Sequence, residues 1–304
     1  MILSYEGTDI TDEVTVSRCV YEACEIGRVP WLSVEFDDAA GLWDKWGPQP
    51  GERIAVVEEG IAATGAMYVD KVEPQSGGYA IHATAMPIAD ARAVREWRDT
   101  TLLTVAGQLS TVLGLGFESH GCDDMAIAYA RQDDEGAAAV LSRLAVVSGC
   151  TLDVYDGRLH LCSRGWVESR TAVGTVALGE ESDYAYSRKA PFASCTVSQP
   201  ATADASGLME ECGEGEPRLA VVLDKSIALP GSAELRRACS GVLAHENARR
   251  SAGYVRGSSL SPYSPGSVCV VSCEKTPSIS GRSVVTRVRN DFAEQSSKTW
   301  WRTL

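Results

Sequence analysis

The fold is decided by PGERIAVV at residues 50–57 with GAMYVDKV at residues 65–72, and by PGSVCVV at residues 265–271 with GRSVVTRV at residues 281–288. Each copy has a Pro-Gly turn, a β-branched strand, a short loop, a Gly and a second strand with Val at the same two offsets from that Gly. Such self-similarity indicates one β unit used twice. Pro-Gly turns before Val-rich strands are common in β proteins, so chance similarity is the alternative interpretation.

The composition is that of a globular protein with two or three domains. The chain has 304 residues, of which 44% are hydrophobic and 23% are charged, and this is too long for a single ordinary core. It contains no run of about 18 apolar residues, so we expect no membrane span. Residues 1–7 lack a basic region and turn acidic at once, which argues against a signal peptide.

The charge balance is acidic. The chain has 41 Asp and Glu against 28 Lys and Arg, which gives a formal net charge of −13. Proteins that grip phosphate backbones need clustered Lys and Arg, so we expect no specific nucleic-acid binding. An acidic surface would let a polyanion pass without holding it.

Residues 1–95 are predicted to form a first β-barrel. Residues 14–20 and 31–36 alternate in polarity, as half-buried strands do. Further short strands are predicted at residues 54–57, 66–72 and 79–85, between turns rich in Pro and Gly. At least five short strands with such punctuation indicate an antiparallel barrel or sandwich.

Residues 96–165 are predicted to form a small α/β module. Asp99 or Thr100 is expected to cap a first helix that Gly114 ends, because apolar residues recur there at intervals of three and four. A second helix is predicted from about Asp134 to residue 147, with Gly149 after it. Asp156-Gly157 then lies between two alternating runs, which is a strong signal for a β-hairpin.

Residues 166–304 are predicted to form a second β-barrel that also holds a helix at about residues 232–250. Strands are expected at residues 193–198 and 219–224, with a mobile loop rich in Gly, Glu, Ala and Ser at residues 200–217. Three strands follow the helix, at residues 268–273, 283–290 and 298–304. The predicted fold class is therefore mainly β, with two similar β-barrels flanking an α/β insert.

Catalytic and metal-binding motifs are not found in the sequence, so we predict no catalytic residue, no metal and no cofactor. The four His residues are scattered, and no Cys-x-x-Cys pair occurs among the ten Cys, which we interpret mostly as small buried residues. The alternative is a hydrolase that acts on cell wall and uses acidic residues such as Asp123 or Glu180.

Five segments follow one another in an order that is typical of one protein family. They are the aromatic segment 43–52, the strand and Pro element 79–87, the Trp-containing helix entry 96–102, Gln132 with the helix that precedes Gly149, and the closing segment 265–292, in which Asn290 takes the place of the usual His. In these segments the chain resembles the late control protein D family, the hub proteins of phage tail baseplates and related injection systems.

The resemblance implies a structural protein rather than an enzyme. It implies a homotrimer in which two barrels per chain, similar to the tail-tube fold, form a ring of six against a hexameric tail-tube protein, while the other face receives a trimeric central spike protein. Other baseplate proteins are further partners. The implied location is the tail of a virion, a bacteriocin or another injection particle, assembled in the bacterial cytoplasm. The hub of a long non-contractile tail is the alternative within this class. The hydrolase named above, as a secreted or tail-borne cell-wall hydrolase, is the alternative outside it.

Two aromatic residues are the candidate interface residues. Trp43 and Trp46 lie three apart in a segment rich in Gly and Pro, and aromatic anchors carry much of the energy of protein interfaces. The alternative is that they cover the mouth of their own barrel. For the ring as a whole, we expect a bore lined by acidic or neutral side chains.

Overall fold

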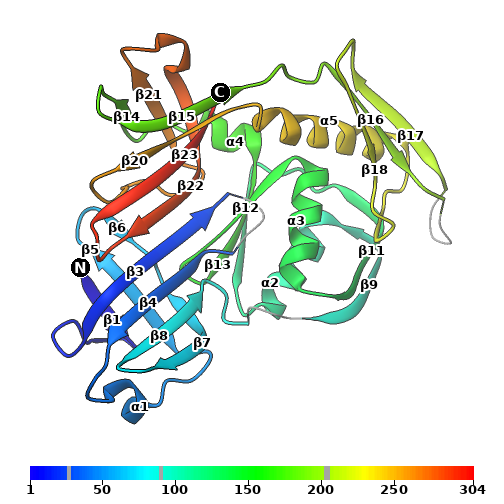
Figure 1. Ribbon diagram of the computed structural model, residues 1–304. Helices are drawn as coiled ribbons and strands as arrows, with labels where there is room; N and C mark the ends of the chain where they lie inside the picture. Colours follow the sequence, from blue (N-terminus) through cyan, green and yellow to red (C-terminus); the bar gives the residue numbers. More distant parts are fainter. Residues whose placement is uncertain (26–28, 89–91, 202–205) are drawn as a thin grey trace.

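The computed structural model describes residues 1–25, 29–88, 92–201 and 206–304. The chain is mainly β, as predicted, and its largest element is a mixed sheet that runs through both ends of the sequence (Figure 1). Among the described residues, no helix is both long and apolar enough to cross a bilayer.

The large sheet consists of two units. The first unit contains β1 (Ile2–Tyr5), β2 (Thr8–Asp9), β3 (Thr15–Cys24), β4 (Trp31–Asp37), β5 (Arg53–Glu58), β6 (Ala62–Ala63), β7 (Met67–Gln75) and β8 (Gly78–Thr84). The second unit contains β14 (Thr175–Leu178), β15 (Asp183–Arg188), β20 (Ser251–Gly257), β21 (Val268–Cys273), β22 (Gly281–Asp291) and β23 (Ser296–Thr303).

The two units have the same strand order. In the first unit it is β5-β7-β8-β4-β3, and in the second it is β21-β22-β23-β20-β15. The antiparallel pairing of β22 with β3 joins the units into one sheet. The path of this sheet is open at both ends, and no closed barrel is found within the described residues. The two predicted barrels are thus replaced, in a single chain, by two similar parts of one open sheet.

The register of the paired strands repeats as well. Arg53 lies opposite Tyr68 in the first unit, and Val268 lies opposite Val284 in the second, which are equivalent positions of the two sequence copies. The second strand of each copy then carries a bulge against the next strand, at Asp70 in β7 and Thr286 in β22, again at the same offset. Because the bulge lies five residues after the Gly in each copy, it is part of the repeated unit and not a local irregularity. The repeat predicted from the sequence is therefore confirmed in strand order and register.

The Pro-Gly turns have the same hydrogen bonds in both units. The N–H of Gly51 donates to Val69 O at 2.7 Å, and the N–H of Gly266 donates to Val285 O at 2.8 Å. Both glycines have positive φ, at 91° and 79°, a backbone conformation that glycine adopts without strain. Val271 is buried, like Val56 at the equivalent position of the first copy, whereas Val270 is exposed.

The insert between the units begins with β9 (Ala93–Thr101), α2 (Leu102–Val112), β10 (Gly116–His120) and β11 (Ala126–Glu135). It continues with α3 (Ala137–Ser148), β12 (Cys150–Tyr155), β13 (Arg158–Ser163) and α4 (Arg164–Ser169). The cap of α2 is Thr101, not Asp99 or Thr100, because β9 extends to that residue. The predicted start of α3 at Asp134 is wrong, since Asp134 still belongs to β11. The hairpin turn at Asp156-Gly157 is confirmed, with positive φ at both residues.

A second part of the insert interrupts the second unit. It consists of β16 (Ser194–Gln199), β17 (Leu208–Gly213), β18 (Arg218–Val222), β19 (Ile227–Ala228) and α5 (Ser232–Ala248). β17 pairs with β16, so the mobile loop predicted at residues 200–217 is wrong where β17 lies; residues 202–205 are outside the described residues. α5 packs against α3, and β19 pairs with β11, so this segment lies with the insert (Figure 1). The domain boundaries at residues 95 and 165 stay a prediction.

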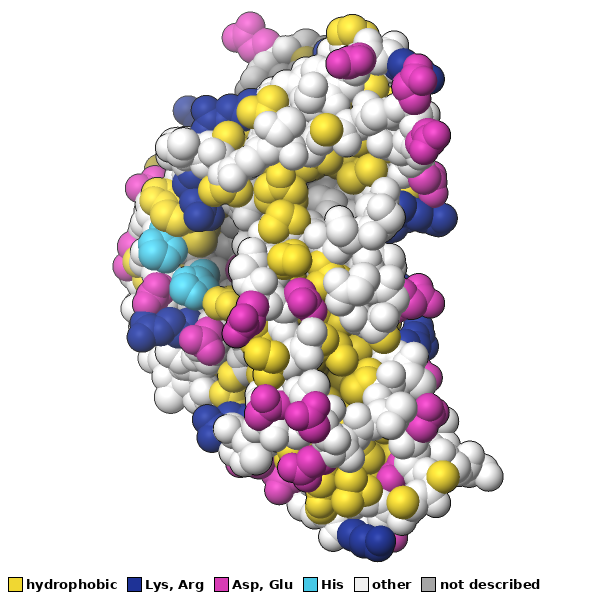
Figure 2. Space-filling model, turned by 90° about the vertical axis from the view of Figure 1, so that its left-hand side faces the viewer, with side chains coloured by type: hydrophobic (Ala, Val, Ile, Leu, Met, Phe, Trp, Pro, Cys, Tyr) yellow, Lys and Arg dark blue, Asp and Glu magenta, His cyan; other side chains and the backbone are white. Residues whose placement is uncertain are grey.

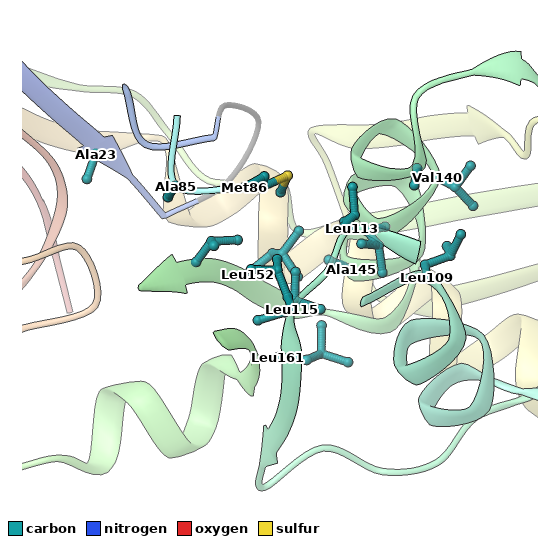
Figure 3. Close-up of a cluster of buried hydrophobic side chains, with 14 of the residues drawn as sticks. Ala23, Ala85, Met86, Leu109, Leu113, Leu115, Val140, Ala145, Leu152 and Leu161 are labelled. Atoms are coloured by element: carbon teal, nitrogen blue, oxygen red, sulfur yellow. The ribbon is translucent and has the colours of Figure 1, made fainter. Parts of the chain in front are cut away.

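The first unit and the insert share one hydrophobic core. Met86, which follows β8, lies beside Leu152 of β12 and near Leu113 and Leu115 at the end of α2 (Figure 3). The second unit has a smaller core of its own around Trp301, Val285 and Val271.

Buried charged and polar groups attach the helices of the insert to the sheet. Arg302 of β23 donates through Nη1 to Glu168 Oε1 of α4 at 2.7 Å, and Arg164 of α4 donates through Nη2 to Nδ1 of His245 at 2.8 Å. Burial, together with the nearby charges of Arg249, Arg164 and Arg302, lowers the pKa of His245 to about 4. His245 is therefore neutral in the folded protein at neutral pH and accepts the hydrogen bond.

We predict that Gly241→Ala destabilises the protein, although Ala favours helices over Gly. A Cβ at residue 241 of α5 would lie 2.6 Å from the backbone N of Gly149 and 2.7 Å from Val147 O. The helices must then move apart, and such overpacking costs about 1–3 kcal/mol. Urea unfolding measures the effect. The control is Gly165→Ala in α4, where a Cβ meets no atom within 4 Å. Equal stability of Gly241→Ala and the wild type would contradict the close packing.

We predict that His245 makes the protein less stable in acid. Between pH 6.5 and about 4 the unfolded chain binds a proton at this residue and the folded chain does not, so the free energy of unfolding falls as the pH falls. From pH 7 to pH 5 the wild type should lose about 2 kcal/mol more than His245→Gln. Burial raises the pKa of Asp153 to about 6, with the opposite slope, but both proteins share that residue. Parallel losses in the two proteins would contradict the prediction.

Candidate assembly interface

The strand order leaves β15 with an unpaired outer edge. β15 pairs with β20, and within the described parts of the chain no strand pairs with its other side. Arg18 and Glu35 form an ion pair across β3 and β4 at 2.9 Å, and Asp183 and Arg256 form one across β15 and β20 at 3.1 Å. The two pairs occupy the same row of their units, with the charges exchanged. β15 is therefore the counterpart of β3, but it lacks the equivalent of β22 beside it.

The first unit has a complementary open edge on β7. β5 pairs with β7 only at Tyr68 and Met67, and residues 71–75 of β7 pair with β8 alone among the described strands. By the repeat, residues 71–75 correspond to residues 287–291 of β22, which pair with β3. One chain thus contains one complete junction, β22 with β3, and the two separate halves of a second one.

The complete junction is held by polar side chains. Arg287 of β22 donates to the buried Glu22 of β3 at 2.7 Å. Asn290 accepts from the N–H of Ser261 at 2.9 Å and donates to its carbonyl oxygen at 3.1 Å, so that it fixes the loop before β21. On the open edges, Ser187 and Pro74 stand in the places of Glu22 and Asn290. Proline has no N–H to donate and is typical of edge strands.

The structure separates the two candidate interface tryptophans. Trp43 is only 1% exposed and packs inside the first unit, with ring centroids 4.5 Å from Phe36 and 4.9 Å from Trp46. Both tryptophans belong to α1 (Leu42–Trp46), which Asp38 caps by accepting from the N–H of Leu42 at 2.7 Å. Trp43 is therefore a core residue in this chain. Trp46 is half-buried, and its role in an interface stays a prediction.

The two acidic residues considered for hydrolysis do not come together. The side chain of Asp123 is 89% exposed and pairs with Arg237 of α5 at 3.3 Å. The side chain of Glu180, before β15, is 83% exposed and pairs with Lys275 at 3.2 Å. These two carboxylates therefore do not form a pair with each other. Glu180 lies in the wall of a cleft that Glu181 and Asp183 also line, and the hydrolase alternative stays a prediction.

Two of the scattered histidines do meet, which the sequence did not predict. The parallel pairing of β10 and β13 places Glu118 beside His160, with His120 two residues farther along β10. Glu118 Oε2 lies 3.7 Å from His120 Nε2 and 3.5 Å from His160 Nδ1. On the face in Figure 2, histidine side chains lie side by side next to a hollow. The strand that holds His160 was predicted as part of the hairpin at Asp156-Gly157, but neither β10 nor its pairing with β13 was predicted.

This Glu-His-His cluster has the ligand types that a metal ion binds, with ligand atoms within 4.8 Å of one another. Donors around tetrahedral zinc with bonds of about 2.0–2.1 Å are about 3.3 Å apart, so the 3.5 and 3.7 Å distances to Glu118 Oε2 are close to that spacing. The His120 ring also stacks on Trp166 at 4.6 Å and lies nearly parallel to the His160 ring. The Arg158 guanidinium group contacts the same carboxylate. Both histidines lie in the wall of a cleft of about 520 Å³, and the absence of a metal stays a prediction.

The comparisons with known proteins identify the fold. No protein-family model and no curated protein sequence matches this chain. The 43 kDa tail protein of prophage MuSo2 from Shewanella oneidensis matches with a TM-score of 0.70 and 12% identity, over 99% of this chain and 98% of that one. A tail protein from Neisseria meningitidis matches with the same TM-score and identity, over 99% and 96% of the two chains.

A component of the type VI secretion system of E. coli is also similar, with a TM-score of 0.61 and 12% identity over 100% of this chain and 77% of that one. That component is itself described as similar in structure to two tail proteins of bacteriophage T4. These relationships confirm, at the level of the fold, the resemblance that the sequence segments indicate. This chain has the fold of phage tail proteins and of a related type VI secretion component.

Proposed function

We propose that the chain is the structural hub of a tail baseplate, where a homotrimer joins the hexameric tail-tube protein to the trimeric central spike protein. The observation that carries the proposal is the pair of open edges, on β7 and β15, which repeats the two sides of the β22·β3 junction. An edge strand with unpaired N–H and C=O groups is a template for pairing and has to be covered. A second copy of the chain offers the matching edge.

Closed rotational symmetry would cover both of these edges. If β7 of one chain pairs with β15 of the next, each chain contributes two similar units and one new junction. Three chains then form a ring of six units in which no β7 or β15 edge stays open, whereas a ring that does not close would grow without limit. The barrel that one chain lacks would form from the joined sheets of all three. Six similar units match a hexameric tube, and three identical chains match a trimeric spike.

The internal junction fixes the register of the proposed one. In β22·β3, Val288 lies opposite Ala23 and Asp291 lies opposite Val20. Transferred through the repeat, Val72 lies opposite Arg188 of the neighbouring copy, and Gln75 lies opposite Ala185. Gln75 and Ala185 are both exposed in the single chain, which leaves them accessible for this contact.

The location and the other partners follow from the same proposal. The hub would lie in the tail of a virion or injection particle, assembled in the bacterial cytoplasm beside other baseplate proteins. The net charge of −13 suits a bore that does not hold DNA, because a basic bore would bind a polyanion. Trp46 would be an anchor for a partner at the α1 end of the first unit.

The register predicts a specific disulfide between copies. Directly opposite residues in antiparallel strands have Cα atoms about 4.5–5.5 Å apart, within the range that a disulfide spans. Gln75→Cys combined with Ala185→Cys should give, after mild oxidation, covalent species up to a trimer on a non-reducing gel. The measurement is made with the chain alone and with the tail-tube protein added.

The matched control is Gln75→Cys combined with Ser187→Cys. Ser187 is exposed and lies two residues away on the same strand, so the diagonal distance of about 7–8 Å disfavours a bond. The two single variants account for the native cysteines. Dimers alone, a ladder beyond three chains, or equal cross-linking in the control under both conditions would overturn the trimer and its register.

A further inference from the structure

A cleft of about 390 Å³ lies where the insert meets both β units. Its wall includes Glu25 after β3, Arg164 of α4, His245 of α5, Arg249 after α5, Arg287 of β22 and Arg302 of β23. These residues come from five different elements and from both ends of the chain. In a protein with a net charge of −13, four guanidinium groups around one cleft are an unusual concentration of positive charge.

Several N–H groups of these arginines lack an acceptor. Arg164 is 8% exposed and Arg302 is 4% exposed. Within the described residues, Nε and Nη1 of Arg164, Nε and Nη2 of Arg302, and Nε of Arg287 have no hydrogen-bond partner. A buried donor without a partner costs free energy, and more so on a charged group. Buried polar groups in folded proteins are nearly always satisfied by protein, water or a ligand.

Three carboxylates pair with arginines of the cleft, but they leave the N–H groups named above without a hydrogen bond. Glu22 pairs with Arg287 at 2.7 Å, and Glu168 accepts from Arg302 at 2.7 Å. Glu25 Oε1 lies 3.7 Å from Arg302 Nη2, which is an ion pair without a hydrogen bond.

The side chain that is hydrogen-bonded to Arg164 carries no negative charge. This side chain is the imidazole of His245, and burial with the surrounding arginines keeps the pKa of His245 at about 4. The four arginines of the cleft thus face three carboxylates and a neutral histidine.

We propose that this cleft binds a phosphate-class oxyanion, held by Arg164 and Arg302 and screened at the surface by Arg249. The guanidinium group is a planar fork of N–H donors that matches phosphate oxygens. Arg164 and Arg302 together have four nitrogen atoms without acceptors. A carboxylate has only two oxygens to offer them, whereas a tetrahedral oxyanion has four. The site does not depend on the trimer, because every residue of the cleft belongs to one chain.

The proposal places a charged ligand at the joint between the units and the insert. Bound there, the anion would bridge α4 to β23 and satisfy donors that the chain alone leaves unpaired. A ligand that binds only the folded state raises the apparent stability by RT ln(1 + c/Kd), where c is the free ligand concentration, so the effect grows with that concentration.

The test is titration of the full chain with sodium phosphate at pH 7.5, against sodium gluconate at equal ionic strength. We expect saturable binding by calorimetry and a rise in unfolding temperature with phosphate but not with gluconate. Arg164→Gln should weaken phosphate binding about tenfold or more, because it removes charge-assisted hydrogen bonds. Arg249→Gln, at an exposed position, decides the matter if Arg164→Gln does not fold, and it should also weaken binding.

The matched control is Arg236→Gln. Arg236 is an exposed arginine of α5 that lies outside the cleft and pairs with Glu210. The control variant should bind phosphate like the wild type. Equal unfolding temperatures in phosphate and gluconate would overturn the proposal, as would phosphate binding that Arg164→Gln and Arg249→Gln leave unchanged. Failure of this test leaves the trimer untouched, since cross-linking through residues 75 and 185 is measured without phosphate.

Discussion

The pairing of β22 with β3 is the contact on which the architecture depends. It joins residues 20–24 to residues 287–291, the two ends of the chain, and turns two similar units into one sheet. Glu22 is buried in it, so its carboxylate needs Arg287; losing one member of such a pair costs about 3–5 kcal/mol because a buried charge is left alone. Contacts so distant in sequence carry a large loop-closure cost and form late in folding. The insert between them must therefore fold compactly enough to bring these strands together.

The same pairing accounts for what the chain leaves open. A duplicated unit has two equivalent junctions, and a single chain can complete only one of them. The remaining halves, residues 71–75 of β7 and residues 183–188 of β15, are short and mostly polar, and Pro74 removes one donor from β7. Short, polar edge strands that contain proline reduce uncontrolled association of natural β-sheets before the correct partner binds. The proposed β7·β15 junction would lack both the Glu22–Arg287 ion pair and the Asn290 amide. It would therefore have fewer stabilising side-chain contacts than the β22·β3 junction.

Sequence reasoning predicted the features that depend on local signals. The Pro-Gly turns, the Asp156-Gly157 hairpin and the end of α3 at Gly149 follow from residues that adopt positive φ. Sequence reasoning failed for features that depend on contacts between residues far apart in the sequence. Residues 208–213 lack strand-forming residues but become β17 because β16 lies beside them. Residues 194–248 join the insert because Gly149 and Gly241 let two helices touch. The meeting of His120 with His160 depends on parallel pairing, and the arginine cleft on five elements at once, so neither was visible in the sequence.

The charge exchange between Arg18–Glu35 and Asp183–Arg256 has a consequence for how an assembly would come apart. Two units with identical charges would pair with themselves as readily as with each other, whereas exchanged charges make the units distinguishable. In the proposed ring, junctions within one chain, β22 with β3, would alternate with junctions between chains, β7 with β15. Mechanical load would open the junctions between chains first, because no covalent chain connection spans them. The ring would then separate into three folded chains, each with its β22·β3 junction and its hydrophobic cores intact. The trimer could therefore dissociate and form again while each chain stays folded.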